Sequence, residues 1–381
     1  MSGSQTRTVF LTLLVTQLVT SGCFLNLMRG DFNLPPARNT PDFRNLNCTD
    51  YLLATSNVSR FDSLFLAENN SYFTKMRERY RFGERFFAID SAETTRWFYS
   101  TTGITSGVAV VVHGLNMRPS KMGDITAFLQ GEGIDVLRVT LTGHRGDMRE
   151  MYLASRERWL SDLFRAYCVA AYHVSRNSGQ APIYFVGYSL GALINSDLMT
   201  ERMVEEVNYN RMILFAPPVA IHRKIRLLRS FTRLIGLFDN PYSFYPHPPH
   251  RYRRPYLRQY LINPDMPVLA YDALFDSFSA LRRKSAAVLN IPTTVFVDLE
   301  DEFVSPEGLA NFVQDRGLNC WMFFTLRNRE GVSNKTDSLM VIEIKNPIHH
   351  SITDEALMGD EWQSMRMMMR ERLEEMSTCQ H

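Results

Sequence analysis

Short apolar runs alternate with longer amphipathic stretches over about residues 84–378. The β-branched run at 108–112 is typical of a strand buried on both faces of a parallel sheet. Segments with apolar residues three and four positions apart predict the helices. Strands are expected at 86–89 and 95–99 as an outer pair, then at 108–112, 136–141, 183–186, 212–215, 293–297 and 340–344, and helices at 122–130, 153–175, after 306 and at about 354–376. This alternation predicts an α/β fold with a doubly wound, mostly parallel sheet.

Two regions depart from the alternation. Residues 218–290 are rich in arginine and aromatic side chains. Because structureless stretches of this length are uncommon inside compact domains unless they form lids or binding segments, we expect a cap insertion there. Residues 24–83 are polar and mixed, and we interpret them as a tether and an N-terminal extension. The main domain is therefore expected to span 84–378.

The pattern of the first 23 residues predicts a signal peptide. Arg7 precedes a short apolar segment at 9–20, and the small residues Ser21-Gly22 come before Cys23. This ending resembles a bacterial lipoprotein signal, in which the cysteine is lipidated after cleavage. A cleaved signal without lipid, an uncleaved anchor running on through 24–28 and a first buried helix stay open. We expect an exported protein of the cell envelope, either a membrane-anchored lipoprotein or a periplasmic or secreted protein.

Composition narrows the classes of partner and cofactor. The chain has 42 basic and 40 acidic residues, a formal net charge of +2, so its overall charge gives no reason to expect nucleic-acid binding. Its five cysteines show no C-x-x-C or other metal-binding spacing, so we expect no metal. Cys168 falls in a helical apolar pattern and is expected in the core. A bridge from Cys48 to Cys320 or Cys379 is left open.

The strongest chemical signal is Gly187-Tyr188-Ser189-Leu190-Gly191, directly after the apolar run 183–186. A serine between a buried strand and a helix sits on a sharp, strained turn, and the glycines let strand and helix close around it. The helix N-terminus behind the hydroxyl favours developing negative charge. Ser189 is therefore the predicted nucleophile.

A serine nucleophile needs a base and an acid that orients the base. The carboxylate cluster after the strand at 293–297 supplies the acid: Asp301 is preferred and Asp298 is the second choice, against the alternative of a solvated acidic loop. The loop after the strand at 340–344 contains His349 and His350. We favour His350 as the base because it has more reach from the strand end, and His349 stays open.

A fourth element is the turn His113-Gly114-Leu115-Asn116 after the run 108–112. A glycine turn here lets a backbone N–H point at the carbonyl oxygen under attack. We predict an oxyanion hole from the amides of Leu115 and Leu190, with His113 as a structural residue and not a base. The Gly143-His144-Arg145-Gly146 stretch is expected to be a turn near the site mouth.

These turns together resemble the α/β-hydrolase superfamily, and more narrowly the bacterial lysophospholipase and monoacylglycerol-lipase-like serine esterases. The resemblance covers about 84–378 and implies an α/β-hydrolase fold, a Ser189–His350–Asp301 triad, an acyl-enzyme intermediate and no cofactor. It predicts a serine hydrolase that cleaves carboxylic esters of small molecules or lipids, held at a membrane by its N-terminal anchor. An acyltransferase, thioesterase or serine peptidase on the same triad, and a non-catalytic envelope protein on a hydrolase fold, stay as alternatives.

Overall fold

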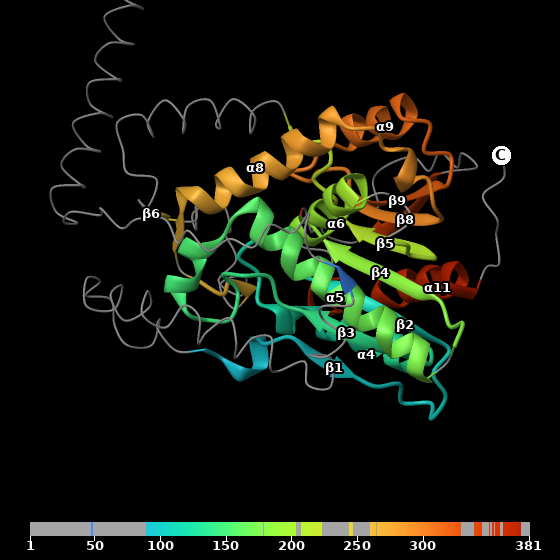
Figure 1. The fold of residues 1–381 in the computed structure, drawn as a ribbon. Helices are drawn as coiled ribbons and strands as arrows, with labels where there is room; N and C mark the ends of the chain where they lie inside the picture. Colours follow the sequence, from blue (N-terminus) through green and yellow to red (C-terminus); the bar gives the residue numbers. More distant parts are fainter. Residues whose placement is uncertain are drawn as a thin grey trace, which may run out of the picture.

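The computed structural model describes residues 47–48, 89–177, 179–202, 207–222, 244–246, 260–263, 265–328, 339–344, 350, 353, 355–358 and 361–374 (Figure 1). The predicted signal, with Cys23, and nearly all of the extension 24–83 lie outside these residues, as does much of the predicted cap at 218–290. Within the described ranges, no helix combines the length and the apolar character needed to cross a bilayer.

An eight-stranded sheet forms the centre of the described structure, in the order β1-β3-β2-β4-β5-β8-β9-β10. The edge strand β1 is antiparallel to β3, and all other neighbours in the sheet are parallel. The sheet therefore confirms the predicted mostly parallel α/β architecture. Its strands are β1 (Arg96–Phe98), β2 (Gly107–Val112), β3 (Ile134–Val139), β4 (Ile183–Tyr188), β5 (Arg211–Phe215), β8 (Thr293–Asp298), β9 (Trp321–Asn328) and β10 (Leu339–Ile344).

The helices cover both faces of this sheet. They are α4 (Gly123–Gly131), α5 (Arg156–Asn177), α6 (Leu190–Arg202), α8 (Val268–Arg283), α9 (Pro306–Asp315), α10 (Glu355–Met358) and α11 (Glu361–Glu374). Short 3₁₀ helices lie at η3 (Ser91–Glu93), η4 (Pro119–Met122), η5 (Met148–Leu153) and η7 (Ala287–Leu289). A separate antiparallel pair, β6 (Phe244–Pro246) and β7 (Asp265–Pro267), falls within the predicted cap range.

The order of the strands fixes which helices share a face. The chain passes from β2 outward to β3, and then back past β2 to β4. Because parallel crossovers are right-handed, this reversal places α4 on one face and α5, α6 and α8 on the other, where Figure 1 shows these three together. The α11 helix lies on the same face as α4, because Arg370 pairs with Glu132 and the Arg366 guanidinium lies over the Phe128 ring. The strand order reverses between β2 and β4, and α/β sheets bind ligands at the carboxyl ends of the strands beside such a reversal.

Burial of the central strands explains their composition. Every residue of β2, β3 and β4 is buried. Most of their side chains are apolar, as strands covered on both faces require, and the two charged residues of β3, Asp135 and Arg138, have hydrogen-bond partners. The amphipathic α5 buries Trp159, whose indole N–H donates to the carbonyl of Thr142. The core thus holds β2, β4 and their following turns in fixed positions.

Two strand predictions need correction. The strand β9 was not predicted, although Trp321-Met322-Phe323-Phe324 is an apolar run; it lies between β8 and β10 and makes them non-adjacent. The segment 95–99 was expected to pair with 86–89, but β1 pairs with β3, whose Val136 lies opposite Phe98. Ile89 is in no strand, and residues 86–88 lie outside the described residues.

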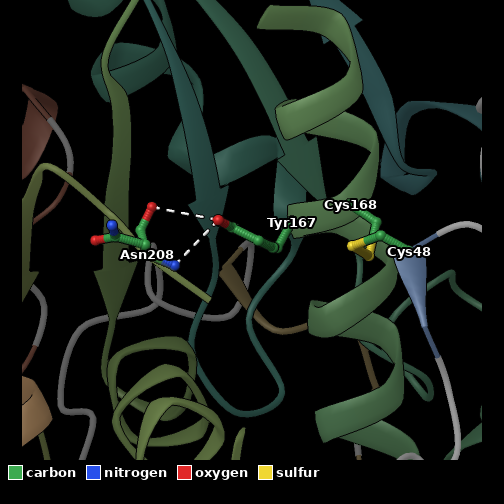
Figure 2. Close-up of a disulfide and its surroundings, with 4 residues drawn as sticks. All are labelled: Cys48, Tyr167, Cys168 and Asn208. Atoms are coloured by element: carbon green, nitrogen blue, oxygen red, sulfur yellow. Dashed lines mark hydrogen bonds between the residues drawn. A yellow bond between two sulfur atoms is a disulfide. The ribbon is translucent and has the colours of Figure 1, made fainter. Parts of the chain in front are cut away.

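A disulfide joins Cys48 to Cys168 on α5, with the two Cα atoms 5.1 Å apart (Figure 2). The suggested bridge from Cys48 to Cys320 or Cys379 is therefore wrong. Cys168 is buried as expected, but it is bonded to another cysteine. The preceding residue, Tyr167, points the opposite way in Figure 2, where its hydroxyl accepts from the Asn208 amide at 3.0 Å. Cys320 is disulfide-bonded as well.

Candidate active site

Ser189 occupies the turn between β4 and α6 with a backbone φ of 47°, in the left-handed region that non-glycine residues seldom adopt. Its two flanking glycines are required by close packing. A Cβ on Gly191 would lie 2.7 Å from the carbonyl oxygen of Val112, and one on Gly187 would lie 2.8 Å from the amide nitrogen of Ala192. The strained turn at Ser189 is therefore held by strand and helix backbones that touch each other.

Asp301 lies in the turn after β8 and is only 2% exposed. Its Oδ1 accepts two backbone hydrogen bonds, from the amides of Phe303 and Val304, each at 2.8 Å. Its Oδ2 lies 2.7 Å from Nδ1 of His350. The carboxylate is thus fixed by its own turn and presents one oxygen to the imidazole.

His350 lies between this carboxylate and the serine. Its Nε2 is 2.8 Å from the Ser189 hydroxyl oxygen, while Nδ1 faces Asp301. Burial by itself lowers the pKa of His350, but the charge and hydrogen bond of Asp301, with the charge of Glu302, outweigh burial and raise the pKa above its usual 6.5. The structure therefore brings together all three predicted triad residues in the order serine, histidine, aspartate.

Asp298 and His349 were the alternates for the acid and the base. Asp298 is buried at the end of β8 and shapes the acid turn: its Oδ1 accepts from the Glu300 amide and its carbonyl accepts from the Asp301 amide. The imidazole of His350 meets Asp301 and not Asp298. His349 lies outside the described residues.

The turn at residues 113–116 lies beside the serine. A Cβ on Gly114 would come within 3.3 Å of the Ser189 Cβ, and the Gly191 amide donates to the His113 carbonyl at 3.1 Å. In the part of the chain that the structure describes, the amides of Leu115 and Leu190 have no hydrogen-bond acceptor. Among the described residues, these two amides adjoin Gly114 and Ser189 and are left without an acceptor.

Two buried histidines hold this turn in place. The His144 Nε2 accepts from the Asn116 amide at 2.9 Å, and the His113 Nε2 accepts from the Leu141 amide at 3.1 Å. Both rings are fully buried, with centroids 4.4 Å apart. Burial lowers the pKa of His144 to about 4 and that of His113 well below 6.5, so both are neutral and each ring can accept. The expected turn near the site mouth is therefore a buried support, and sequence reasoning missed the role of His144.

Residues 103–320 match the hydrolase family described as serine aminopeptidase, S33. The chain belongs to this family. The match spans more than half of the sequence, and it includes the 113–116 turn, Ser189 and Asp301. No curated protein matches the sequence.

Solved structures show the same fold for this S33-family chain. A soluble variant of monoglyceride lipase from Saccharomyces cerevisiae is 11% identical, with 78% of this chain and 99% of that chain covered and a TM-score of 0.55. A lipase in its open form is 13% identical, with coverages of 76% and 99% and a TM-score of 0.53. A structure from work on two metagenome-derived lipolytic enzymes is 15% identical, with coverages of 76% and 100% and a TM-score of 0.50. At these identities the likeness establishes the α/β-hydrolase fold.

In this S33-family hydrolase, the segment 260–263 is attached to the turn that offers the free amides. The Ile262 amide donates to the Asn116 carbonyl. The Asn116 side chain bonds the Asn263 backbone twice: its Nδ2 donates to the Asn263 carbonyl, and its Oδ1 accepts from the Asn263 amide. Asn263 also donates to the Gly143 carbonyl, beside His144. Sequence reasoning missed this buried asparagine pair, which joins residues 260–263 of the predicted cap range to the 113–116 turn.

The start of the predicted cap range is attached to the acid turn. Ile221 forms an antiparallel bridge with Val304, and the His222 amide donates to the Phe303 carbonyl. The His222 Nε2 lies 2.9 Å from the carbonyl oxygen of Asp301. Residues 221–222 and 260–263 of the cap range therefore contact the turns that contain Asp301 and residues 113–116. No cluster of histidine, cysteine, aspartate and glutamate suited to a metal ion occurs among the described residues of the hydrolase.

Proposed function

We propose that this protein is a serine ester hydrolase that cleaves carboxylic esters through an acyl-enzyme intermediate. The observation that carries the proposal is the continuous chain of contacts from Ser189 through His350 to Asp301, with distances of 2.8 and 2.7 Å. A neutral imidazole in this position takes the serine proton, and the buried carboxylate holds the ring with Nε2 toward the serine. The proposed roles are nucleophile for Ser189, general base for His350 and orienting acid for Asp301.

The proposed reaction has two half-reactions. The Ser189 oxygen attacks the ester carbonyl carbon while its proton moves to Nε2 of His350. The amides of Leu115 and Leu190 receive the resulting oxyanion, and one such donor is worth about 3 kcal/mol in the transition state. The C–O bond to the alcohol then breaks, and His350 returns the proton to the leaving oxygen. Water repeats the sequence on the acyl-enzyme, which releases the carboxylic acid and restores the serine.

We further propose that the protein is exported and held at the cell envelope by lipidated Cys23, with the main domain at 84–378. The Cys48–Cys168 disulfide supports export, because disulfides persist outside the reducing cytosol. The proposed substrate class is a small-molecule or lipid ester. The arginine and aromatic side chains of residues 218–290 suit phosphate groups and acyl chains respectively.

Labelling with a fluorophosphonate probe tests the mechanism. Wild type should be labelled on Ser189 and should hydrolyse p-nitrophenyl esters, and Ser189→Ala should lose both properties. The matched control is Ser196→Ala, a buried serine on α6 whose hydroxyl donates to the Ala192 carbonyl. Full ester hydrolysis by folded Ser189→Ala would contradict the proposal. A series of acyl lengths, with and without an added alcohol acceptor, then separates hydrolysis from acyl transfer.

A further inference from the structure

Tyr188 connects three parts of the proposed active site. It is the last residue of β4 and directly precedes Ser189, and its side chain is buried. Its hydroxyl donates a hydrogen bond of 2.9 Å to the backbone carbonyl of His350. Tyr188 is thus bonded covalently to the nucleophile residue, and its side chain holds the backbone of the base.

The tyrosine ring also packs on the turn at residues 113–116, here named the oxyanion turn because its Leu115 amide is a proposed oxyanion donor. A Cβ built on Gly114 would lie 2.6 Å from Cε1 and 2.7 Å from Cδ1 of Tyr188, so the ring fills the space that a larger residue at 114 would need. The same ring has its centroid 5.3 Å from that of the His350 imidazole. The Phe303 ring centroid is 5.1 Å from the imidazole centroid. Aromatic contacts and one hydroxyl therefore limit where the imidazole can lie.

We propose that Tyr188 is a positioning residue that fixes His350 relative to Ser189 and the oxyanion turn. The inference rests on the proposed function, because the position of His350 matters to the rate only if His350 is the base. The imidazole has to place Nε2 within hydrogen-bond reach of the serine oxygen at the moment of attack. Asp301 fixes the far side of the ring, at Nδ1, and the Tyr188 hydroxyl fixes the backbone from which the ring projects. Small displacements of a reacting group are costly to the rate.

A single substitution separates positioning from packing. Tyr188→Phe keeps the ring on Gly114 and removes only the hydroxyl. A hydrogen bond of this kind is worth about 0.5–1.5 kcal/mol, which corresponds to a rate loss of about two- to tenfold. We expect kcat for ester hydrolysis to fall by this factor with KM unchanged, because the hydroxyl bonds the backbone of the base and has no proposed role in substrate binding.

The matched control is Tyr184→Phe, the same chemical change four residues earlier on the same strand, where the side chain is also buried. Kinetics of fluorophosphonate labelling, kcat and KM are measured for wild type and both variants, together with the melting temperature. Slower labelling and lower kcat in Tyr188→Phe alone, at full final labelling, support the proposal. Equal rates in Tyr188→Phe and wild type, or equal losses in the two variants, overturn it.

A second measurement judges Tyr188 independently of activity. Proton NMR follows the Nδ1–H of His350, which is assigned by its disappearance in His350→Gln. Faster solvent exchange of this proton in Tyr188→Phe, with no change in Tyr184→Phe, supports the positioning role, and unchanged exchange in both contradicts it. If wild type is not labelled on Ser189, the proposed function fails, while the NMR result still decides whether Tyr188 fixes the imidazole.

Discussion

Asp301 contacts His350 through a single carboxylate oxygen, Oδ2, at 2.7 Å. The other oxygen, Oδ1, accepts from the amides of Phe303 and Val304. These two backbone bonds orient the carboxylate without help from the histidine. The side chain can therefore accept from Nδ1–H, and this interaction selects the tautomer that leaves Nε2 free to receive the serine proton.

Asp301→Asn should reverse that tautomer. The two backbone amides would keep the asparagine oxygen on their side, so the side-chain NH₂ would face Nδ1 and force the proton onto Nε2. We expect kcat to fall by about 10⁴-fold while the protein stays folded. Steady-state kinetics check this loss, with Asp298→Asn as the comparison, because an asparagine oxygen can still accept from the Glu300 amide. A similar collapse of kcat in both variants would speak against the assignment of Asp301.

The activity should depend on pH through His350. Burial lowers its pKa, but Asp301 and Glu302 raise it further than burial lowers it, so the pKa lies above 6.5. Since the base must be neutral, kcat/KM should rise with increasing pH and reach half its maximum above pH 6.5. Glu302→Gln removes one negative charge and should move this midpoint downward. A pH profile with its midpoint below 6.5 in wild type would contradict the expected balance.

Local signals along the chain account for what could be predicted. The apolar run at 108–112 predicts a buried strand, and the glycines around Ser189 predict a tight turn. Both signals are local, because each depends only on neighbouring residues in the sequence. The chain order of serine, acid and base, each after a strand, was enough to locate the acid and base loops. Asp301 and His350 were preferred within these loops, with Asp298 and His349 as the alternates. Parallel strands place their carboxyl ends at the same edge of the sheet, so residues far apart in sequence meet there.

What could not be predicted depends on pairs with no local signal. Asn263 bonds to Asn116 from 147 residues away, and Cys48 bonds to Cys168 across 120 residues. No spacing rule relates such partners, because the fold alone brings them together. The strand β9 was missed because a four-residue apolar run cannot be told from a helix segment by its pattern. The motif G-x-S-x-G sets no residue type at the position of Tyr188, so the sequence offers no reason to assign it a role. Its contact with the His350 carbonyl supplies that reason.

The buried histidines that hold the 113–116 turn should make stability depend on pH. Burial lowers the pKa of His144 to about 4, whereas an unfolded histidine has a pKa of about 6.5. Between these values the unfolded chain binds a proton that the folded chain does not, so stability should fall as the pH falls through this window. The limit is about 1.4 kcal/mol per pH unit for each such histidine. Urea unfolding at pH 7 and pH 5 checks this, and His144→Gln, which still offers an acceptor to Asn116, should reduce the slope. An unchanged slope would exclude His144 as the source.

The disulfide should contribute to stability and not to catalysis. It closes a loop between residues 120 positions apart, and its loss should reduce the free energy of unfolding by about 2–5 kcal/mol. Cys48→Ser, Cys168→Ser and the double variant all break the same bond, so their losses should agree, except that Cys168→Ser also places a hydroxyl in a buried position. Urea unfolding of each variant without reductant, which leaves the disulfide of Cys320 intact, measures each loss, and kcat is followed in parallel. Two substitutions that remove the same bond cannot each cost the full free energy of that bond in one molecule. A loss in the double variant equal to the sum of the two single losses would therefore contradict a shared disulfide.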